Sequence, residues 1–156
     1  MKKSRIGILT GGGDCAGLNP AMKWVVKTAT DDRLQAERGI QYEVIGIRDP
    51  HGFRPLCLGR LNGHWVLASE SCALDLVQAE FVREIEPGEI VIIDANGPRS
   101  LRMPEAGRQS FCIFEFIYFA RPDSTFMGRN VYQIRKAHGR ILAQEAPVPA
   151  DLVMPF

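Results

Sequence analysis

The sequence predicts a mixed α/β protein, in which an N-terminal βαβ unit is joined to antiparallel hairpins and helices. A glycine-rich loop separates an apolar run at residues 5–9 from a segment of helical periodicity. Short β-branched runs bounded by turn signals then fill the middle of the chain. Because the chain has 156 residues, 46% of them hydrophobic, it is long enough to bury a core without disulfide bonds or metals.

The first 49 residues are expected to form a strand, a loop, a helix and a second strand. RIGIL, residues 5–9, is the first strand candidate, and Asn19 and Pro20 suit the cap and the first turn of a helix. Apolar side chains then recur at helical spacing at Met22, Val25, Val26 and Ala29. YEVIGI, residues 42–47, is the second strand, and the connection between two such parallel strands should be right-handed.

A hairpin is expected to follow this unit. The residues Asp-Pro-His-Gly at 49–52 are a turn signal. FRPLCLGRL, residues 53–61, is therefore expected to return as a strand antiparallel to residues 42–47. HWVLAS, residues 64–69, is predicted to be a further strand.

The rest of the chain predicts two helices and a strongly β-branched strand. Residues 72–81 have helical spacing, and EIVIID at 89–94 lies between a Pro-Gly and an Asn-Gly turn. The apolar run 111–120 fits a helix or a strand equally well. Residues 131–146 predict a helix with Val131, Ile134, Ile141 and Leu142 on one face, and DLVMPF at 151–156 resembles a strand.

Charge and cysteine content restrict the environment and the partners. The 19 basic and 18 acidic side chains nearly cancel, which gives no reason to expect nucleic acid or an anionic membrane as a partner. No apolar run reaches the length of a membrane span. The cysteines form no CxxC pair, so we expect reduced thiols and a cytoplasmic location; they are Cys15, Cys57, Cys72 and Cys112.

Several polar residues are expected to have structural roles. The histidines lack the spacing of metal ligands; His51 is expected in a turn, His138 on an exposed or border helix position, and His64 is isolated. Glu84, Glu86 and Glu89 are expected to be solvated positions around a turn rather than a catalytic pair of carboxylates.

The glycine loop is expected to bind an anion, because backbone N–H groups at a helix N-terminus attract phosphate. Gly11, Gly13 and Ala16 fit the pattern G-x-G-x-x-A of dinucleotide-binding folds, with Asp49 as the ribose-binding acid. That fit is loose, since Asp14 would lie unfavourably close to a pyrophosphate.

The residue sequence of the glycine loop is more specific to one family than the spacing of its glycines is. RIGILTGGGDCAGLNPAMKWVVKTA, followed by YEVIGIRD, resembles the N-terminus of 6-phosphofructokinases, including those that use pyrophosphate. The resemblance covers residues 4–49 and implies Mg²⁺ with ATP or pyrophosphate as ligands. It places Gly12 on the donor phosphate, with the turn shaped by Gly11, Gly13 and Asp14. The segments for the base and the sugar phosphate are absent, so phosphate binding is the most we expect.

The remaining residues resemble a different family. RDPHGFRPLCLGRL, WVLASESCALDL, VREIEPGEIVIID and FEFIYFARPDSTFMGRNVYQIRKAHGRILAQEAPVPADLVMP are similar to amidophosphoribosyltransferase, the glutamine-dependent enzyme that opens purine synthesis. This resemblance covers residues 49–156. The resemblance implies that residues 50–110 are part of a glutaminase domain with an N-terminal-nucleophile hydrolase fold. It implies that residues 111–156 form the linker and a truncated start of the phosphoribosyltransferase domain. Residues 1–49 remain the phosphofructokinase-like segment, so the chain is predicted to be a chimera, whether natural, designed or mis-assembled.

The resemblance also predicts which working parts are present. The family's nucleophile is an N-terminal cysteine, whereas this sequence begins Met-Lys-Lys, and the loop for phosphoribosyl pyrophosphate is missing, so we expect an inactive fragment. Cys112 matches an iron–sulfur ligand of some members, but a cluster needs four thiolates, so a buried apolar thiol is expected. Arg121 and Asp123 could line the route of ammonia between two catalytic domains; a structural salt bridge is the alternative.

Three functions therefore stay open on the sequence alone. The chain is an amidophosphoribosyltransferase-like glycosyltransferase fragment, a phosphofructokinase-like fragment that binds a small phosphorylated ligand, or a non-catalytic binding or scaffold module. In each case apolar faces that lost their partners would be exposed, and homo-oligomers could form through them.

Overall fold

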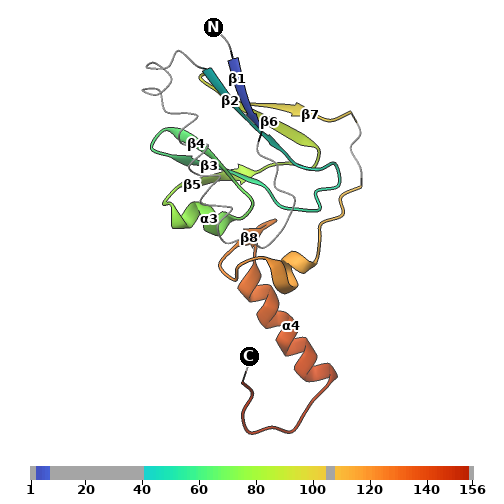
Figure 1. Cartoon of the computed structure of the whole chain (residues 1–156). Helices are drawn as coiled ribbons and strands as arrows, with labels where there is room; N and C mark the ends of the chain where they lie inside the picture. The colour runs from blue at the N-terminus through green and yellow to red at the C-terminus, as the bar shows by residue number, and fades with distance from the viewer. Residues whose placement is uncertain (1–2, 8–40, 105–107, 155–156) are drawn as a thin grey trace.

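The computed structural model describes residues 3–7, 41–104 and 108–154 (Figure 1). The predicted glycine loop, with Gly11, Gly12, Gly13 and Asp14, and the helix expected after it lie outside the described residues. The described part contains a four-stranded, a three-stranded and a two-stranded β-sheet, a short helix, a π-helical turn and a projecting C-terminal helix.

The first sheet has four strands in the order β1-β2-β6-β7. Its strands are β1 (Lys3–Gly7), β2 (Gln41–Ile47), β6 (Glu89–Asp94) and β7 (Gly97–Arg102). β1 and β2 are parallel, as predicted for the first unit, whereas β6 is antiparallel to both β2 and β7. The predicted strand at 89–94 and the Asn-Gly turn after it are also confirmed.

The second sheet has three antiparallel strands in the order β4-β3-β5. They are β3 (Cys57–Leu61), β4 (His64–Ala68) and β5 (Glu80–Glu84). The hairpin predicted between residues 42–47 and 53–61 is therefore wrong, because β3 pairs with β4 and β5. The physical reason is that both edges of β2 are already occupied, by β1 and by β6.

A buried arginine turns the chain from one sheet into the other. Arg48 follows β2, is 4% exposed, and donates from its guanidinium to the backbone carbonyls of Arg54 and Ile85. The Asp49 carboxylate accepts hydrogen bonds from the backbone N–H groups of His51 and Phe53. Residues 48–53 form this bend, so they are not available for a direct hairpin with β2.

Helix α3 (Ser71–Leu76) is shorter than the predicted helix at 72–81. Gln78 adopts a left-handed φ of 57°, which an α-helix does not tolerate, and Ala79 N–H donates back to the Leu74 carbonyl. Phe81 therefore belongs to β5 instead of the helix. The apolar spacing that predicted one long helix is shared between a short helix and a strand.

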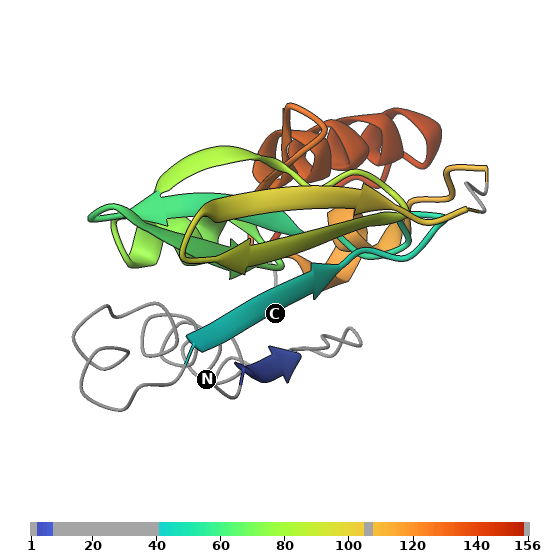
Figure 2. The same cartoon turned by 90° about the horizontal axis from the view of Figure 1, so that it is seen from above.

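The core lies between the two sheets and beneath α3. One buried cluster combines side chains of both sheets and of the segments beside them, namely Val44, Leu56, Leu58, Leu67, Ile85, Val91 and Ile93. A second cluster joins the three-stranded sheet to α3 and contains Cys57, Val66, Ala68, Leu74 and Ala79. Figure 2 shows the two sheets as stacked layers, with the C-terminal helix at one end. A Cβ at Gly46 would lie 2.6 Å from Leu67, so the sheets approach closely there.

The C-terminal part begins with a π-helical turn, η1 (Glu115–Phe119), in the run that sequence periodicity left undecided. A short hairpin of β8 (Thr125–Phe126) and β9 (Arg129–Asn130) leads into α4 (Val131–Glu145), which confirms the predicted helix. The Asn130 side chain caps α4 by accepting from Gln133 N–H at 3.2 Å. A third buried cluster, of Phe116, Ala120, Phe126 and Val131, holds these elements together.

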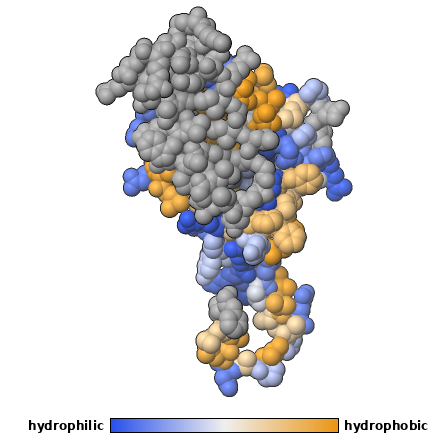
Figure 3. Space-filling model, in the orientation of Figure 1, coloured by the Kyte–Doolittle hydropathy of each residue, from blue (hydrophilic) through white to orange (hydrophobic). Residues whose placement is uncertain are grey.

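The far half of α4 and the tail after it are largely exposed. Val131 is fully buried, but Ile141 and Leu142, predicted on the same face, are 50% and 64% exposed. The strand predicted at 151–156 is wrong for the described residues 151–154, which are exposed and pair with no strand of the described part. Figure 3 shows apolar colour at this end of the molecule, where Val148 and Val153 are exposed. Within the described ranges, no helix is both long and apolar enough to cross a membrane.

Candidate functional site

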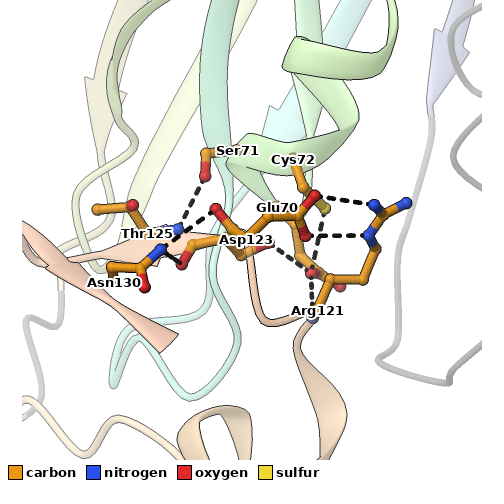
Figure 4. A network of polar contacts seen from close by, with 8 residues as sticks. Glu70, Ser71, Cys72, Arg121, Asp123, Thr125 and Asn130 are labelled. Atoms are coloured by element: carbon orange, nitrogen blue, oxygen red, sulfur yellow. Dashed lines mark hydrogen bonds and ion pairs between the residues drawn. The ribbon is translucent and has the colours of Figure 1, made fainter. Parts of the chain in front are cut away.

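A polar junction ties the start of α3 to the segment that precedes α4 (Figure 4). Its centre is the Glu70 carboxylate. Glu70 Oε2 accepts hydrogen bonds from Arg121 N at 3.0 Å, from Ser124 Oγ at 2.8 Å and from Cys72 Sγ at 3.5 Å. One carboxylate oxygen therefore fixes two points of the sequence Arg-Pro-Asp-Ser, about fifty residues further along the chain.

The neighbouring Ser71 strengthens the junction. Its Oγ accepts from Thr125 N–H at 2.9 Å, which holds the first residue of β8 against the first turn of α3. Ser124 is fully buried, and its carbonyl accepts from Val131 N–H at the start of α4. Residues 121–131 are thus attached to α3 at one end and to α4 at the other.

Arg121 and Asp123 form the exposed side of this junction. Arg121 Nε and Nη2 donate to the two carboxylate oxygens of Asp123, at 3.1 and 2.8 Å. These hydrogen bonds raise the pKa of Arg121 above its ordinary value. Both side chains are 52% exposed. The predicted structural salt bridge is present, and its position leaves both charged groups accessible to a neighbouring domain or ligand.

Two further arginines fix η1 beside the junction. Arg135 of α4 donates from Nε and Nη2 to the carbonyls of Phe116 and Ala120, both at 2.8 Å. Arg54 Nη1 lies 3.0 Å from Glu115 Oε1, and its guanidinium stacks 4.7 Å from the Phe119 ring centre. These contacts satisfy carbonyls at the π-helical turn and attach it to the bend that follows β2.

Glu115 is the most buried carboxylate of this region, at 2% exposure. Burial raises its pKa above the ordinary value, the nearby Arg54 charge opposes that rise, and the Glu70 charge adds to it. Glu115 was not among the predicted site residues. The sequence does contain a signal for it, because Glu115 is the only carboxylate in the apolar run at 111–120. A carboxylate in such a run can be buried when a cation lies beside it, as Arg54 does here.

Glu89 corrects one expectation from the sequence. It was expected to be solvated, but it is 4% exposed and accepts from both Nη atoms of Arg83, at 2.9 and 2.6 Å. Ser100 Oγ and Glu86 N–H also donate to it. The hydrogen bonds from Arg83 are the main cause that lowers its pKa to about 2. Alternation along β6 gave the missed signal, because Glu89 shares a face with two buried valine and isoleucine positions, Val91 and Ile93.

The described cysteines and histidines lie at buried, half-buried and exposed positions. Burial raises the pKa of Cys57 to about 12 and that of Cys72 to about 11, so both thiols are protonated at neutral pH. Cys112 is half-buried rather than fully buried as predicted, and all three thiols are free. His51 lies in a turn and His138 is exposed, as predicted. Among residues 3–7, 41–104 and 108–154, no group of histidine, cysteine and carboxylate side chains has a metal-binding arrangement.

The fold of the described part is similar to that of two solved enzyme structures. No family model matches the chain. A solved structure described as the allosteric regulatory enzyme of purine biosynthesis superposes with a TM-score of 0.66 at 48% identity, over 70% of this chain and 23% of its own. The Bacillus subtilis glutamine phosphoribosylpyrophosphate amidotransferase, complexed with ADP and GMP, superposes with a TM-score of 0.65 at 48% identity, over 70% and 24%.

The curated relatives of this chain are amidophosphoribosyltransferases. Amidophosphoribosyltransferase of Mycobacterium tuberculosis is 57% identical over 107 residues, which are 69% of this chain and 20% of that protein. The Archaeoglobus fulgidus enzyme is 48% identical over 110 residues, 70% of this chain and 24% of its own. The chloroplastic soybean enzyme, from Glycine max, is 50% identical over 113 residues, 72% and 20%.

About 70% of the chain is therefore homologous to amidophosphoribosyltransferases, and this part is an amidophosphoribosyltransferase-like segment. The matched part spans between a fifth and a quarter of the length of these relatives. The resemblance to amidophosphoribosyltransferases that was predicted for residues 49–156 is confirmed as homology over about 70% of the chain. The phosphofructokinase-like character of residues 4–49 stays a prediction.

Proposed function

We propose that this chain acts in glutamine-dependent formation of phosphoribosylamine, as part of an amidophosphoribosyltransferase. The observation that carries the proposal is 57% identity over 107 residues to the Mycobacterium tuberculosis enzyme. In that reaction, glutamine and water give glutamate and ammonia. The ammonia then displaces pyrophosphate from phosphoribosyl pyrophosphate, which leaves phosphoribosylamine.

The described residues supply framework rather than reacting groups in this proposal. Residues 50–110 correspond to the later part of a glutaminase domain, and residues 111–156 to the passage toward the phosphoribosyltransferase domain. The three-stranded sheet β4-β3-β5 and the β6-β7 hairpin, which lie within residues 50–110, support the first assignment. The junction of α3 with residues 121–131 supports the second. Arg121 and Asp123, which are exposed on that junction, border the route of ammonia between the two active sites.

A segment exchange tests this function directly. The matched residues of the Mycobacterium tuberculosis enzyme are replaced by the homologous 107-residue segment of this chain, and phosphoribosylamine formation from glutamine is measured. Because related cores tolerate many substitutions that keep volume and pattern, activity should stay within about tenfold of the parent enzyme. A folded exchange enzyme without glutamine-dependent activity would overturn the proposal. The unmodified enzyme, purified in the same way, is the control.

A second candidate function rests on the parallel pairing of β1 with β2. A parallel pair needs a crossover connection, as a phosphofructokinase-like βαβ unit has. The phosphate loop would be formed by Gly11, Gly12, Gly13 and Asp14, with ATP or pyrophosphate and Mg²⁺ as ligands. Calorimetry of the purified chain with each ligand tests it, with Gly12→Val as the matched variant. Absence of heat at millimolar ligand would exclude this function.

Self-association is a further expectation that follows from exposed apolar side chains. Phe114, Ile117 and Tyr118 of the η1 region are 53%, 49% and 71% exposed. A homo-oligomer that covers these side chains would sediment faster than the monomer. A single monomeric species at micromolar concentration would contradict the expectation.

A further inference from the structure

We propose that Glu70 is a positioning residue for ammonia transfer: its carboxylate holds the exposed Arg121–Asp123 turn in the shape that the transfer route requires. The inference rests on the proposed function, because the turn borders that route only in an amidophosphoribosyltransferase. In this role Glu70 itself touches no substrate. It acts through the backbone and side chains that it fixes.

The contacts show how one carboxylate controls the turn. Glu70 Oε2 accepts from Arg121 N at the first residue of the turn and from Ser124 Oγ at its last residue. The turn closes on itself through Ser124 N–H, which donates to the Arg121 carbonyl at 3.0 Å. Both ends of the four-residue turn are therefore attached to the same oxygen atom.

The residues that hold the turn in place are buried, whereas the charged side chains of the turn are exposed to solvent. Ser124 is fully buried and Cys72 is 2% exposed, whereas Arg121 and Asp123 are each 52% exposed. Arg121 and Asp123 bond to each other through their side chains. The position of Arg121 and Asp123 is therefore fixed by the hydrogen bonds of Glu70 on the buried side of the turn.

Removing the carboxylate should change the turn more than the fold. Without it, Arg121 N and the buried Ser124 hydroxyl lose their acceptor, while Ser71 still holds Thr125 and Asn130 still caps α4. Only the hydrogen bond from Ser124 N–H to the Arg121 carbonyl then still joins the two ends of the turn, so the turn is no longer fixed to α3 at Arg121. Transfer between two sites is sensitive to such shifts, because displacement by about 1 Å can cost up to about a hundredfold in rate.

Glu70→Ala in the segment-exchange enzyme tests this role through the coupling between the two reactions. Glutamate release should stay near the level of the exchange enzyme, while phosphoribosylamine formed per glutamate falls about tenfold. Synthesis supported by added ammonium chloride should be unchanged, because free ammonia bypasses the route. Equal loss of all three activities would mean that Glu70 only supports folding, and an unchanged coupling ratio would also overturn the proposal.

Two variants sharpen the test. Glu70→Gln keeps an oxygen acceptor in place and should restore coupling to within about twofold, since neutral acceptors bind more weakly than charged ones. Glu86→Ala removes an exposed carboxylate in the turn between β5 and β6 and should leave coupling unchanged. Uncoupling by Glu86→Ala as large as that by Glu70→Ala would refute the role of the junction.

Amide hydrogen exchange on the purified chain separates this inference from the proposed function. Glu70→Ala should speed exchange at Arg121 N–H at least about tenfold, while Val131 N–H, bonded to the Ser124 carbonyl, keeps its protection. Unchanged exchange at Arg121 overturns the inference whatever the enzyme assays give. An exchange enzyme that lacks glutamine-dependent activity overturns the proposed function, and the role in ammonia transfer with it, even where exchange responds as expected.

Discussion

The ion pair between the buried Glu89 and Arg83 predicts a free energy of unfolding that depends on pH. Glu89 begins β6, is 4% exposed, and accepts from Arg83, Ser100 and the backbone of Glu86. Its pKa falls from the ordinary 4.5 to about 2 in the folded chain. We expect Glu89→Gln to remove the charge that these donors stabilise while keeping the size of the side chain.

The magnitude follows from the pKa and from solvent exposure. The difference between 4.5 and about 2 corresponds to roughly 3 kcal/mol as an upper bound. Arg83 is 39% exposed, so water screens part of the interaction, and we expect a loss of about 2 kcal/mol at neutral pH. Because the folded pKa is lowered, this stability is fully present above the ordinary pKa and is lost as pH falls toward 2.

Urea unfolding of the parent chain and of Glu89→Gln, followed by circular dichroism, measures this difference. The gap in unfolding free energy should be about 2 kcal/mol at neutral pH and should shrink to less than about half of that near pH 3. Glu86→Gln, which changes the exposed neighbouring carboxylate, is the control and should cost less than about 0.5 kcal/mol. A gap that keeps the same size from neutral to acid pH would refute the electrostatic origin.

Three further predictions follow from buried contacts. Ser124→Ala should lose about 1–2 kcal/mol of unfolding free energy in urea, because it leaves Glu70 without its hydroxyl donor; a neutral substitution would contradict this. Gly59→Ala should lose about 1–3 kcal/mol, because its Cβ would lie 2.7 Å from a leucine methyl group, whereas Gly139→Ala, which meets nothing within 4 Å, should gain about 0.5–1 kcal/mol. Equal effects at both glycines would be inconsistent with this packing. Glu115→Gln should become more stable relative to the parent as pH rises above the ordinary pKa of a carboxyl, because burial raises the pKa of Glu115; a gap independent of pH in urea titrations would refute it.

Local patterns in the sequence predicted most individual elements but not how they pair. Alternation and turn residues were sufficient for β4 and β6, and helical spacing was sufficient for α4. The partner of β2 could not be predicted, since an apolar strand pairs equally well with any free edge. The two edges of β2 are occupied by β1 and β6, and the contacts of Arg48 with the carbonyls of Arg54 and Ile85, which hold the bend after β2, exist only in the folded chain.

The candidate site was predicted only in its exposed half. Arg121 and Asp123 are close in sequence, so their ion pair could be foreseen. Glu70 lies 51 residues before Arg121, and no local pattern connects them. Glu89 was misjudged because neighbouring glutamates suggested a solvated turn, although strand alternation already placed it among buried residues.

The unequal burial of α4 has a consequence for its motion. Only its first turns rest on the aromatic cluster and on Arg135, while Ile141 and Leu142 lie in water. Among the described residues, the buried clusters include no side chain of the second half, so its helical structure depends mainly on local backbone bonds. In isolated segments such bonds break and re-form on a timescale near microseconds. The helix should therefore be stiff near Val131 and fray toward Glu145, so that its C-terminal end samples many orientations.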